Sequence, residues 1–163
     1  MNAIVVADRN WAIGCEDHLL FSLPTDMKRF RSLTLNGTVI LGRRTLDTFP
    51  NGKPLPKRRN IVITHQPTFT REGTEVVFSP EEALELAKND ENIWVIGGSS
   101  IYTALLGQCQ RIFVTRVDAE APDADAFFPN LDKLPTWKIE HESEVMEENG
   151  LRFRFVEYLN TEL

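Results

Sequence analysis

The feature that most constrains the fold is a regular alternation of short apolar runs with segments of helical periodicity. The runs are rich in β-branched residues and show no polar–apolar alternation, which is typical of parallel strands covered on both faces. Six such strands are expected, at residues 3–7, 38–41, 60–64, 75–78, 93–96 and 111–115. The pattern predicts an α/β fold with a mostly parallel, twisted sheet and helices on both of its faces.

The last quarter of the chain changes character. Asn149-Gly150 separates two alternating segments, which is the strongest short-range signal for a β-hairpin. The hairpin adds an antiparallel C-terminal edge, so we expect an eight-stranded sheet in a single domain that spans residues 1–163. Two long irregular stretches, residues 9–22 and 118–129, are predicted to be functional loops, because compact domains rarely keep such loops without a use.

Three helices have recognisable ends. Residues 79–89 begin with Ser79 as N-cap and Pro80 at the first helical position, and Glu82 completes a capping box. Residues 99–106 form a second helix, with Gly107 as its expected C-terminal stop. Residues 23–33 form the third, in which Leu23, Met27, Phe30 and Leu33 share one side and Lys28, Arg29, Arg31 and Ser32 occupy the rest.

Asp26 lies inside the apolar arc of the third helix, where a carboxylate is unexpected. Two interpretations remain open at this point. The carboxylate either complements the helix dipole in the first turn, or it serves as the acid of a functional site.

The charge distribution indicates what the protein binds. The net charge of −6 argues against a general nucleic-acid binder. Half of the 18 Lys and Arg residues nevertheless lie between Lys28 and Arg59, an interval whose only acid is Asp47. This region is either a small-anion site or a solvated basic face.

Other patterns limit the location and the chemistry. No apolar stretch approaches the roughly 20 residues that span a bilayer, and no export signal is apparent, so we expect a cytoplasmic protein without a membrane segment. His18, His65 and His141 show no ligand spacing, which argues against a metal site.

Two strand-to-helix junctions have the composition of phosphate cradles. "VILGRRT" places Gly42 before a helix start that carries two arginines, and "WVIGGSSIY" places Gly97-Gly98 before two serines. Helix N-termini attract anions, and the carboxyl ends of parallel strands are where ligands of open α/β sheets bind. The pair suits a dinucleotide, and the arginines suit an additional phosphate, although neither junction is a GxGxxG or Walker motif and either is also compatible with a plain turn.

In their order along the chain, the motifs resemble the dihydrofolate reductase family. The blocks "WAIGCEDHLLFSLPTDMKRF", "TVILGRRT", "PLPKRRNIVIT", "VIGGSSIY" and "TRVDAEAPDADAFFP" and the closing hairpin cover nearly the whole chain. The resemblance implies an NADPH-dependent reduction of 7,8-dihydrofolate to tetrahydrofolate. It also implies that antifolates bind, that the protein is a monomer, and that its first helix lines the pteridine pocket.

The resemblance implies roles for the substrate site. Asp26 would contact the amino and amide edge of the pteridine, Thr115 would be the hydroxyl partner of Asp26, and Arg58 would clamp the α-carboxylate of folate. The implied catalytic residues are Asp26, Thr115, Leu19 and Phe21. The implied substrate contacts are Ile4, Val5, Asp26, Met27, Phe30, Phe49, Leu55, Arg58, Ile96 and Thr115.

The same resemblance implies an NADPH site. The glycine and serine residues of the two junctions would hold the pyrophosphate, the arginine pair would face the 2′-phosphate, and Asp125 would hold the loop at residues 9–22 closed over the nicotinamide. The implied cofactor-binding residues are Val6, Ile13, Gly14, Gly42, Arg43, Arg44, Thr45, Thr64, His65, Gly97, Gly98, Ser99, Ser100, Ile101 and Tyr102.

Three departures from the family pattern concern contacts near the ligands. Leu20-Phe21 stands where the family usually has Pro-Trp, and Phe cannot donate an indole N–H. "TLDTF" replaces an aromatic-Glu-Ser pattern, which weakens the expectation that Thr48 contacts a ligand, and "GGSS" lacks a third glycine.

Two alternatives to dihydrofolate reduction remain open. The pyrimidinone reductase of riboflavin synthesis is similar in fold, but it needs neither the carboxylate at Asp26 nor the clamp at Arg58. A protein that binds folate or a nucleotide without catalysis is the other alternative, and a turnover assay separates it from both enzymes.

Overall fold

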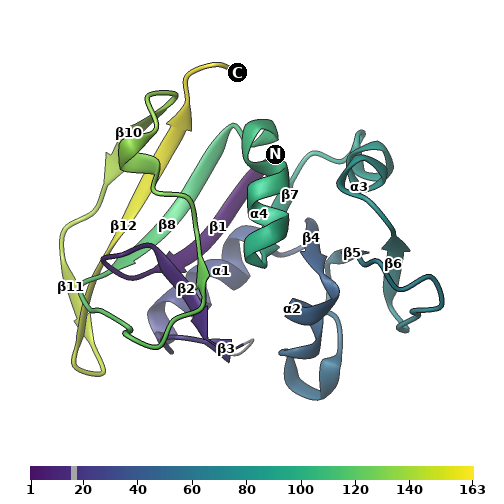
Figure 1. Ribbon diagram of the computed structural model, residues 1–163, viewed down its shortest axis with the longest axis horizontal. Helices are drawn as coiled ribbons and strands as arrows, with labels where there is room; N and C mark the ends of the chain where they lie inside the picture. Colours follow the sequence, from purple (N-terminus) through teal and green to yellow (C-terminus); the bar gives the residue numbers. More distant parts are fainter. Residues whose placement is uncertain (16–17) are drawn as a thin grey trace.

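The main sheet is mostly parallel and has the predicted number of strand positions. The computed structural model describes residues 1–15 and 18–163. The strands pair in the order β10-β12-β8-β1-β7-β4-β5-β6, eight positions in all, and the short β11 pairs with the same β12 (Figure 1). The bounds are β1 (Asn2–Ala7), β4 (Thr38–Gly42), β5 (Arg59–Ile63), β6 (Thr74–Val77), β7 (Ile93–Gly97), β8 (Arg111–Val117), β10 (Trp137–Glu142), β11 (Met146–Glu148) and β12 (Leu151–Asn160).

The prediction of a parallel sheet with an antiparallel C-terminal edge is confirmed. The pairs of β1 with β7 and β8, of β4 with β5 and β7, and of β5 with β6 are parallel. The pairs of β12 with β8, β10 and β11 are antiparallel. All six strands predicted from β-branched runs are present, with ends shifted by one or two residues.

Alternate residues of the parallel strands feed two different hydrophobic layers. In β1, Ala3 and Val5 join a cluster with α3 (Pro80–Ala87) and α4 (Ser99–Leu105), whereas Ile4 joins a cluster with α1 (Pro24–Thr34) and α2 (Arg43–Asp47). In Figure 1, α4 lies in front of β1 and β7 and α1 lies behind the sheet. Helices therefore cover both faces, as the unbroken apolar runs predict.

The two stretches predicted to be irregular are partly strands. β2 (Ala12–Cys15) pairs with β3 (His18–Leu19) and with β9 (Ala126–Phe127) in a small second sheet. Next to this ladder, the backbone N–H of Asp125 donates to the carbonyl oxygen of Gly14 at 3.0 Å. β2 and β9 pair across more than a hundred positions, and β3 has only two residues, so these pairings leave no local periodicity to recognise.

Local capping agrees with the sequence in most details. The Ser79 hydroxyl accepts from the N–H of Glu82 at 3.1 Å, as expected of an N-cap. The capping box differs from prediction, because the Glu82 carboxylate accepts from the N–H of Phe78 rather than that of Ser79. Gly107 lies within a 3-10 turn, η2 (Leu106–Gln108), that continues α4. Further 3-10 turns are η1 (Pro50–Gly52) and η3 (Leu131–Lys133).

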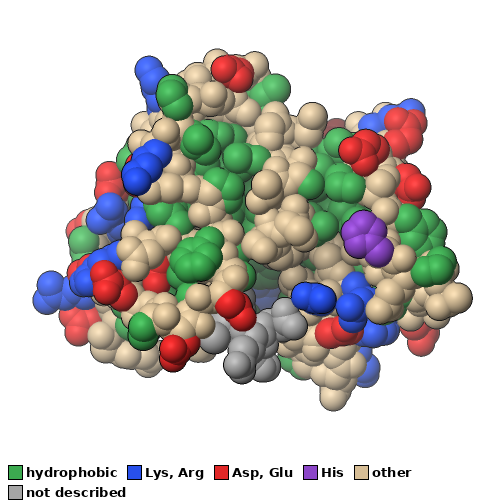
Figure 2. Space-filling view, in the orientation of Figure 1, with side chains coloured by type: hydrophobic (Ala, Val, Ile, Leu, Met, Phe, Trp, Pro, Cys, Tyr) green, Lys and Arg blue, Asp and Glu red, His purple; other side chains and the backbone are tan. Residues whose placement is uncertain are grey.

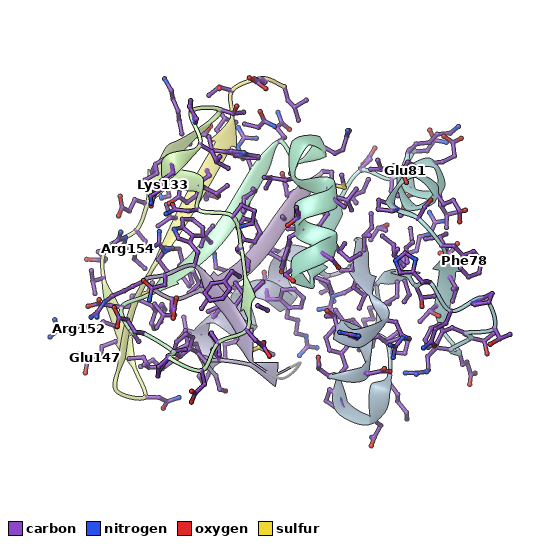
Figure 3. All side chains as sticks on the ribbon, in the orientation of Figure 1. Phe78, Glu81, Lys133, Glu147, Arg152 and Arg154 are labelled. Carbon is purple, nitrogen blue, oxygen red and sulfur yellow. The ribbon has the colours of Figure 1, made fainter. Side chains whose placement is uncertain are left out.

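The predicted hairpin is present at the C-terminal edge. Asn149 and Gly150 both have positive φ angles, 54° and 77°, as a tight two-residue hairpin turn requires. Charged side chains gather along the left edge of the molecule in Figure 2, over β10, β11 and β12. One ion pair joins the two hairpin strands, with 3.8 Å between Arg152 Nε and Glu147 Oε2 (Figure 3).

Candidate active site

A cavity of about 560 Å³ opens at the carboxyl ends of β1, β4, β5 and β7. Its lining includes every residue that the sequence assigns to cofactor binding, and also Val5, Ile96 and Asp125. Lys and Arg side chains gather over the α2 region in Figure 2, beside this part of the molecule. The roles of these residues stay predictions, but the topology brings them to one place.

The two strand-to-helix junctions form one wall of the cavity. Gly42 is the N-cap of α2 and Gly98 is the N-cap of α4, so both helices direct free N–H groups toward the cavity. A Cβ atom at Gly42 would lie 3.3 Å from Ile101 Cγ1, and one at Gly98 would lie 3.4 Å from Thr45 Oγ1. Because glycine has no side chain, a ligand can come close to the backbone N–H groups of this wall.

The arginine pair starts α2 at the edge of the same cavity. Arg43 Nη1 bonds Asp47 Oδ2 at 2.8 Å, one helical turn away, which fixes the direction of the Arg43 side chain. Arg44, Thr64 and His65 line the cavity beside it. The donors are guanidinium, hydroxyl and backbone N–H groups, a chemistry that fits the phosphates of a dinucleotide.

Asp26 is buried on α1, with 8% of its surface exposed. The Thr115 hydroxyl, on β8, donates to Asp26 Oδ1 at 2.5 Å. Burial raises the pKa of the Asp26 carboxyl above its ordinary value, the Thr115 hydrogen bond and the charge of Arg29 oppose that rise, and Glu148 adds to it. A carboxylate that only complemented the helix dipole would remain in water, so the dipole alone does not explain this position.

An apolar layer lies against the same face of the sheet. Ile4, Phe30, Phe49, Leu55 and Ile96, all predicted substrate contacts, belong to one hydrophobic cluster.

Phe21 packs in a neighbouring cluster, beside Leu23 and Phe155. Met27 differs from the wheel expectation, because it is 56% exposed and is not buried against the core. Leu19 belongs to β3, and its predicted side-chain role lies outside the described residues.

Arg58 is held by the protein itself. Its Nε donates to Thr34 Oγ1 and its Nη1 donates to the carbonyl oxygen of Pro56, both at 2.8 Å, and Nη2 makes a longer contact of 3.4 Å with Arg31 O. These bonds leave N–H groups on both terminal nitrogens for a ligand. Arg58 borders a separate, shallower hollow near the starts of β4, β5 and β7, and the described lining of the 560 Å³ cavity includes neither Arg58 nor Asp26.

Several cavity-lining residues were not predicted from the sequence. Ile63, Gln66 and Ala126 line the cavity, and so does Thr48, whose contact with a ligand was only weakly expected. The position of Ile63 at the carboxyl end of β5 is a signal that could have identified it, because that edge carries the other cavity residues. No local signal marks Ala126, which reaches the cavity through the pairing of β9 with β2.

Two kinds of feature are absent from residues 1–15 and 18–163, which the structure describes. In these ranges, no group of three or more His, Cys, Asp or Glu residues is placed to hold a metal ion. In the same ranges, no helix is both long and apolar enough to cross a membrane.

A parallel α/β sheet with paired glycine junctions and a basic helix start at its carboxyl edge defines a nucleotide-binding α/β protein. The sequence model of the dihydrofolate reductase family matches residues 1–160. The chain is 40% identical over 149 residues to a dihydrofolate reductase of Mycobacterium tuberculosis, covering 90% of this chain and 89% of that protein. The chain therefore belongs to the dihydrofolate reductase family.

Two further relatives agree with this assignment. The dihydrofolate reductase of Bacillus subtilis is 32% identical over 157 residues, which cover 95% of this chain and 91% of that protein. A structure of dihydrofolate reductase from Enterococcus faecalis, complexed with NADP(H) and RAB-propyl, superposes with a TM-score of 0.86 at 32% identity. The superposition covers 97% of this chain and 94% of the other.

Proposed function

We propose that this protein reduces 7,8-dihydrofolate to 5,6,7,8-tetrahydrofolate with NADPH. The observation that carries the proposal is the buried Asp26 on α1, hydrogen-bonded to Thr115, in a fold whose carboxyl edge holds a phosphate-compatible cavity. Membership of the dihydrofolate reductase family supports it, and so does the similarity to an enzyme complexed with NADP(H). The proposal includes the cytoplasmic location and the monomeric state expected from the sequence.

The residues of the cavity fit the cofactor. Gly97, Gly98, Ser99, Ser100 and Thr45 would hold the pyrophosphate at the start of α4. Arg43, Arg44, Thr64 and His65 would hold the 2′-phosphate. When bound, NADPH supplies the hydride.

Further cavity residues would orient the nicotinamide. The backbone groups of Val6 and Ile13 would meet its carboxamide, while Gly14 and Ile101 complete the wall. Tyr102 donates to the carbonyl oxygen of Ile4 at 2.7 Å, which fixes both groups at this edge. Asp125, bound through its backbone to Gly14, would keep β2 closed over the ring.

Asp26 would hold the amino and amide edge of the pteridine and favour a proton on the ring. The carbon that accepts the hydride lies beside an imine nitrogen, and this carbon becomes far more electrophilic when the nitrogen is protonated. Asp26 grips the opposite edge of the ring, so a water molecule would deliver the proton to the imine nitrogen. The buried negative charge stabilises the cationic ring electrostatically, and the Thr115 bond keeps the carboxylate oriented toward it.

The remaining substrate contacts follow from the apolar layer and from Arg58. Phe30, Phe49 and Leu55 would contact the benzoyl and pteridine rings, and the Ile4 and Ile96 carbonyl groups would meet the pteridine edge. The Nη1 and Nη2 groups of Arg58 would clamp the α-carboxylate with two parallel hydrogen bonds.

Dihydrofolate-dependent oxidation of NADPH, followed by absorbance, tests the proposal. We expect turnover with dihydrofolate, no oxidation without it, and a severe loss of turnover at neutral pH in Asp26→Asn with NADPH binding retained. Asp90→Asn, which removes a carboxylate near the opposite edge of the sheet, is the matched control and should keep its turnover. Binding of dihydrofolate and NADPH without turnover would instead support the non-catalytic alternative.

A further inference from the structure

Arg29 shares the buried side of α1 with Asp26, although the sequence placed it on the polar side. Its guanidinium carbon lies 4.0 Å from the ring centroid of Phe155 on β12 and 5.4 Å from that of Phe113 on β8. Phe155 is the register partner of Thr115, the residue that bonds Asp26. The cation therefore packs against β8, the strand whose Thr115 bonds the carboxylate, and against its neighbour β12.

Burying the Arg29 guanidinium costs free energy. Its Nη1 is buried, and no hydrogen-bond partner for it occurs among the described residues. The aromatic face of Phe155 attracts the cation, as does the charge of Glu157 on the same strand. Burying an N–H group without a hydrogen-bond partner costs free energy, so an apolar side chain would fill this space better than Arg29 does. The charge of Arg29 therefore indicates a role beyond packing.

Arg29 follows Asp26 by three residues, a spacing that makes two helical side chains neighbours. The opposite charges attract in a partly buried setting, where water screens them less than at the surface. A proton added to the carboxylate removes the negative charge that attracts Arg29. A proton added to a ring held by the carboxylate places a second positive charge near Arg29. Arg29 therefore opposes protonation at this site.

We propose that Arg29 is a positioning residue that acts through Asp26 and sets the upper pH limit of the reduction. This inference rests on the proposed function. With Arg29 present, the site releases the activating proton at a lower pH than it would without the cation.

Other charged groups that face Asp26 act in the opposite sense. Glu148 on β11 faces Asp26 and favours its protonation, and Thr25 holds that glutamate through both its N–H and its hydroxyl at 2.9 and 2.5 Å. Burial is the main cause of the raised pKa of the Tyr102 phenol on α4, and the charge of Asp26 contributes a smaller part of that rise. Within the described residues, Arg29 is the one cation that contributes to lowering the pKa of Asp26.

The first test follows single-turnover oxidation of NADPH by dihydrofolate as a function of pH in Arg29→Met, Arg29→Lys and Arg31→Met. Arg31 lies on the same helix and is exposed, so Arg31→Met is the matched loss of one charge. In Arg29→Met we expect the rate at about pH 9 to rise roughly threefold over the parent, with an unchanged rate at about pH 6. Arg29→Lys, which keeps the charge, should stay close to the parent.

Two kinetic outcomes would overturn the proposal. One is a pH profile of Arg29→Met that coincides with that of Arg31→Met. The other is an equal shift in Arg29→Lys and Arg29→Met, which would assign the effect to packing rather than to charge. Thermal unfolding of each variant verifies that the kinetic comparison is made on folded protein.

A second measurement needs no substrate and so separates this inference from the proposed function. The pKa of Asp26 is measured in the ligand-free protein from the ¹³C shift of its carboxyl carbon, assigned with Asp26→Asn. We expect a higher pKa in Arg29→Met and no comparable change in Arg31→Met. An unchanged pKa refutes the inference even if the enzyme reduces dihydrofolate, and a raised pKa supports it even if the enzyme does not.

Discussion

The hydrogen bond between Thr115 and Asp26 makes a sharp prediction about stability. Thr115 is 1% exposed, and its hydroxyl donates to a carboxylate that is itself buried. Thr115→Val keeps the shape of the side chain and removes only the donor. The loss should therefore depend on whether Asp26 is ionised.

The stability lost in Thr115→Val can be worked out for each of the two protonation states of Asp26. A hydrogen bond to a charged group contributes about 2 kcal/mol, and one to a neutral group about 1 kcal/mol. The added methyl group of Val returns about 0.8 kcal/mol through apolar burial. Thr115→Val should thus cost about 1 kcal/mol where Asp26 is ionised and close to nothing where it is protonated.

The hydrogen bond from Thr115 favours the ionised form of Asp26. The bond lowers the pKa of Asp26 relative to the same site without it. Its extra contribution to stability is present where the carboxylate is ionised and is lost as the pH falls through the folded-state pKa of Asp26, which burial raises. The cost of Thr115→Val should therefore shrink toward acid pH.

Urea unfolding of parent and variant between about pH 5 and about pH 9 measures this difference. Thr34→Val is the control, because Thr34 is equally buried and bonds Phe30 O and Arg58 Nε, neither of which titrates in this range. Its cost should stay constant with pH. A pH-independent cost of Thr115→Val would refute the reasoning, and so would an undiminished cost in the Asp26→Asn background.

Three further predictions concern single residues. Asp26→Asn should raise the free energy of unfolding at neutral pH, because burial raises the pKa of this acid and ionisation then costs stability; urea unfolding should show the gain fading toward acid pH. Arg58→Lys should raise KM for dihydrofolate about 10-fold or more with little change in KM for NADPH, since Lys cannot form two parallel hydrogen bonds. Steady-state kinetics with both substrates measures this, and an equal rise in the two KM values would contradict the prediction. Arg44→Gln should raise KM for NADPH about 10-fold and leave KM for NADH unchanged, and a similar rise with both cofactors would argue against a 2′-phosphate contact.

Much of the fold follows from local sequence signals. The β-branched runs predict the parallel strands because burial on both faces leaves a local record in composition. The turn at Asn149-Gly150 is equally local, since two positive φ angles favour those two residue types. The pairing of β2 with β9 is not predictable in this way, because it depends on the meeting of two segments far apart in the chain, and β3 is too short to leave a recognisable pattern.

The residues of the site also differ in whether local sequence signals predict their positions. The helical wheel alone places Asp26 on the buried side of α1, and the side chain is indeed buried there. The wheel also places Arg29 with the polar residues, yet the side chain lies over Phe155. A long aliphatic stem and a planar, weakly hydrated guanidinium allow Arg to pack against an aromatic ring, and only the pairing of β8 with β12 puts that ring there.

The two charges on the buried side of α1 belong to one physical problem. An ionised Asp26 among apolar neighbours costs folding free energy, and an apolar residue in its place would give a more stable interface. Arg29 reduces that cost and, through the same attraction, opposes the proton that the reaction needs. Stability and pH range are therefore linked at this position: a variant without the Arg29 charge should work at higher pH, and its free energy of unfolding relative to the parent should be lower where Asp26 is ionised than where it is protonated.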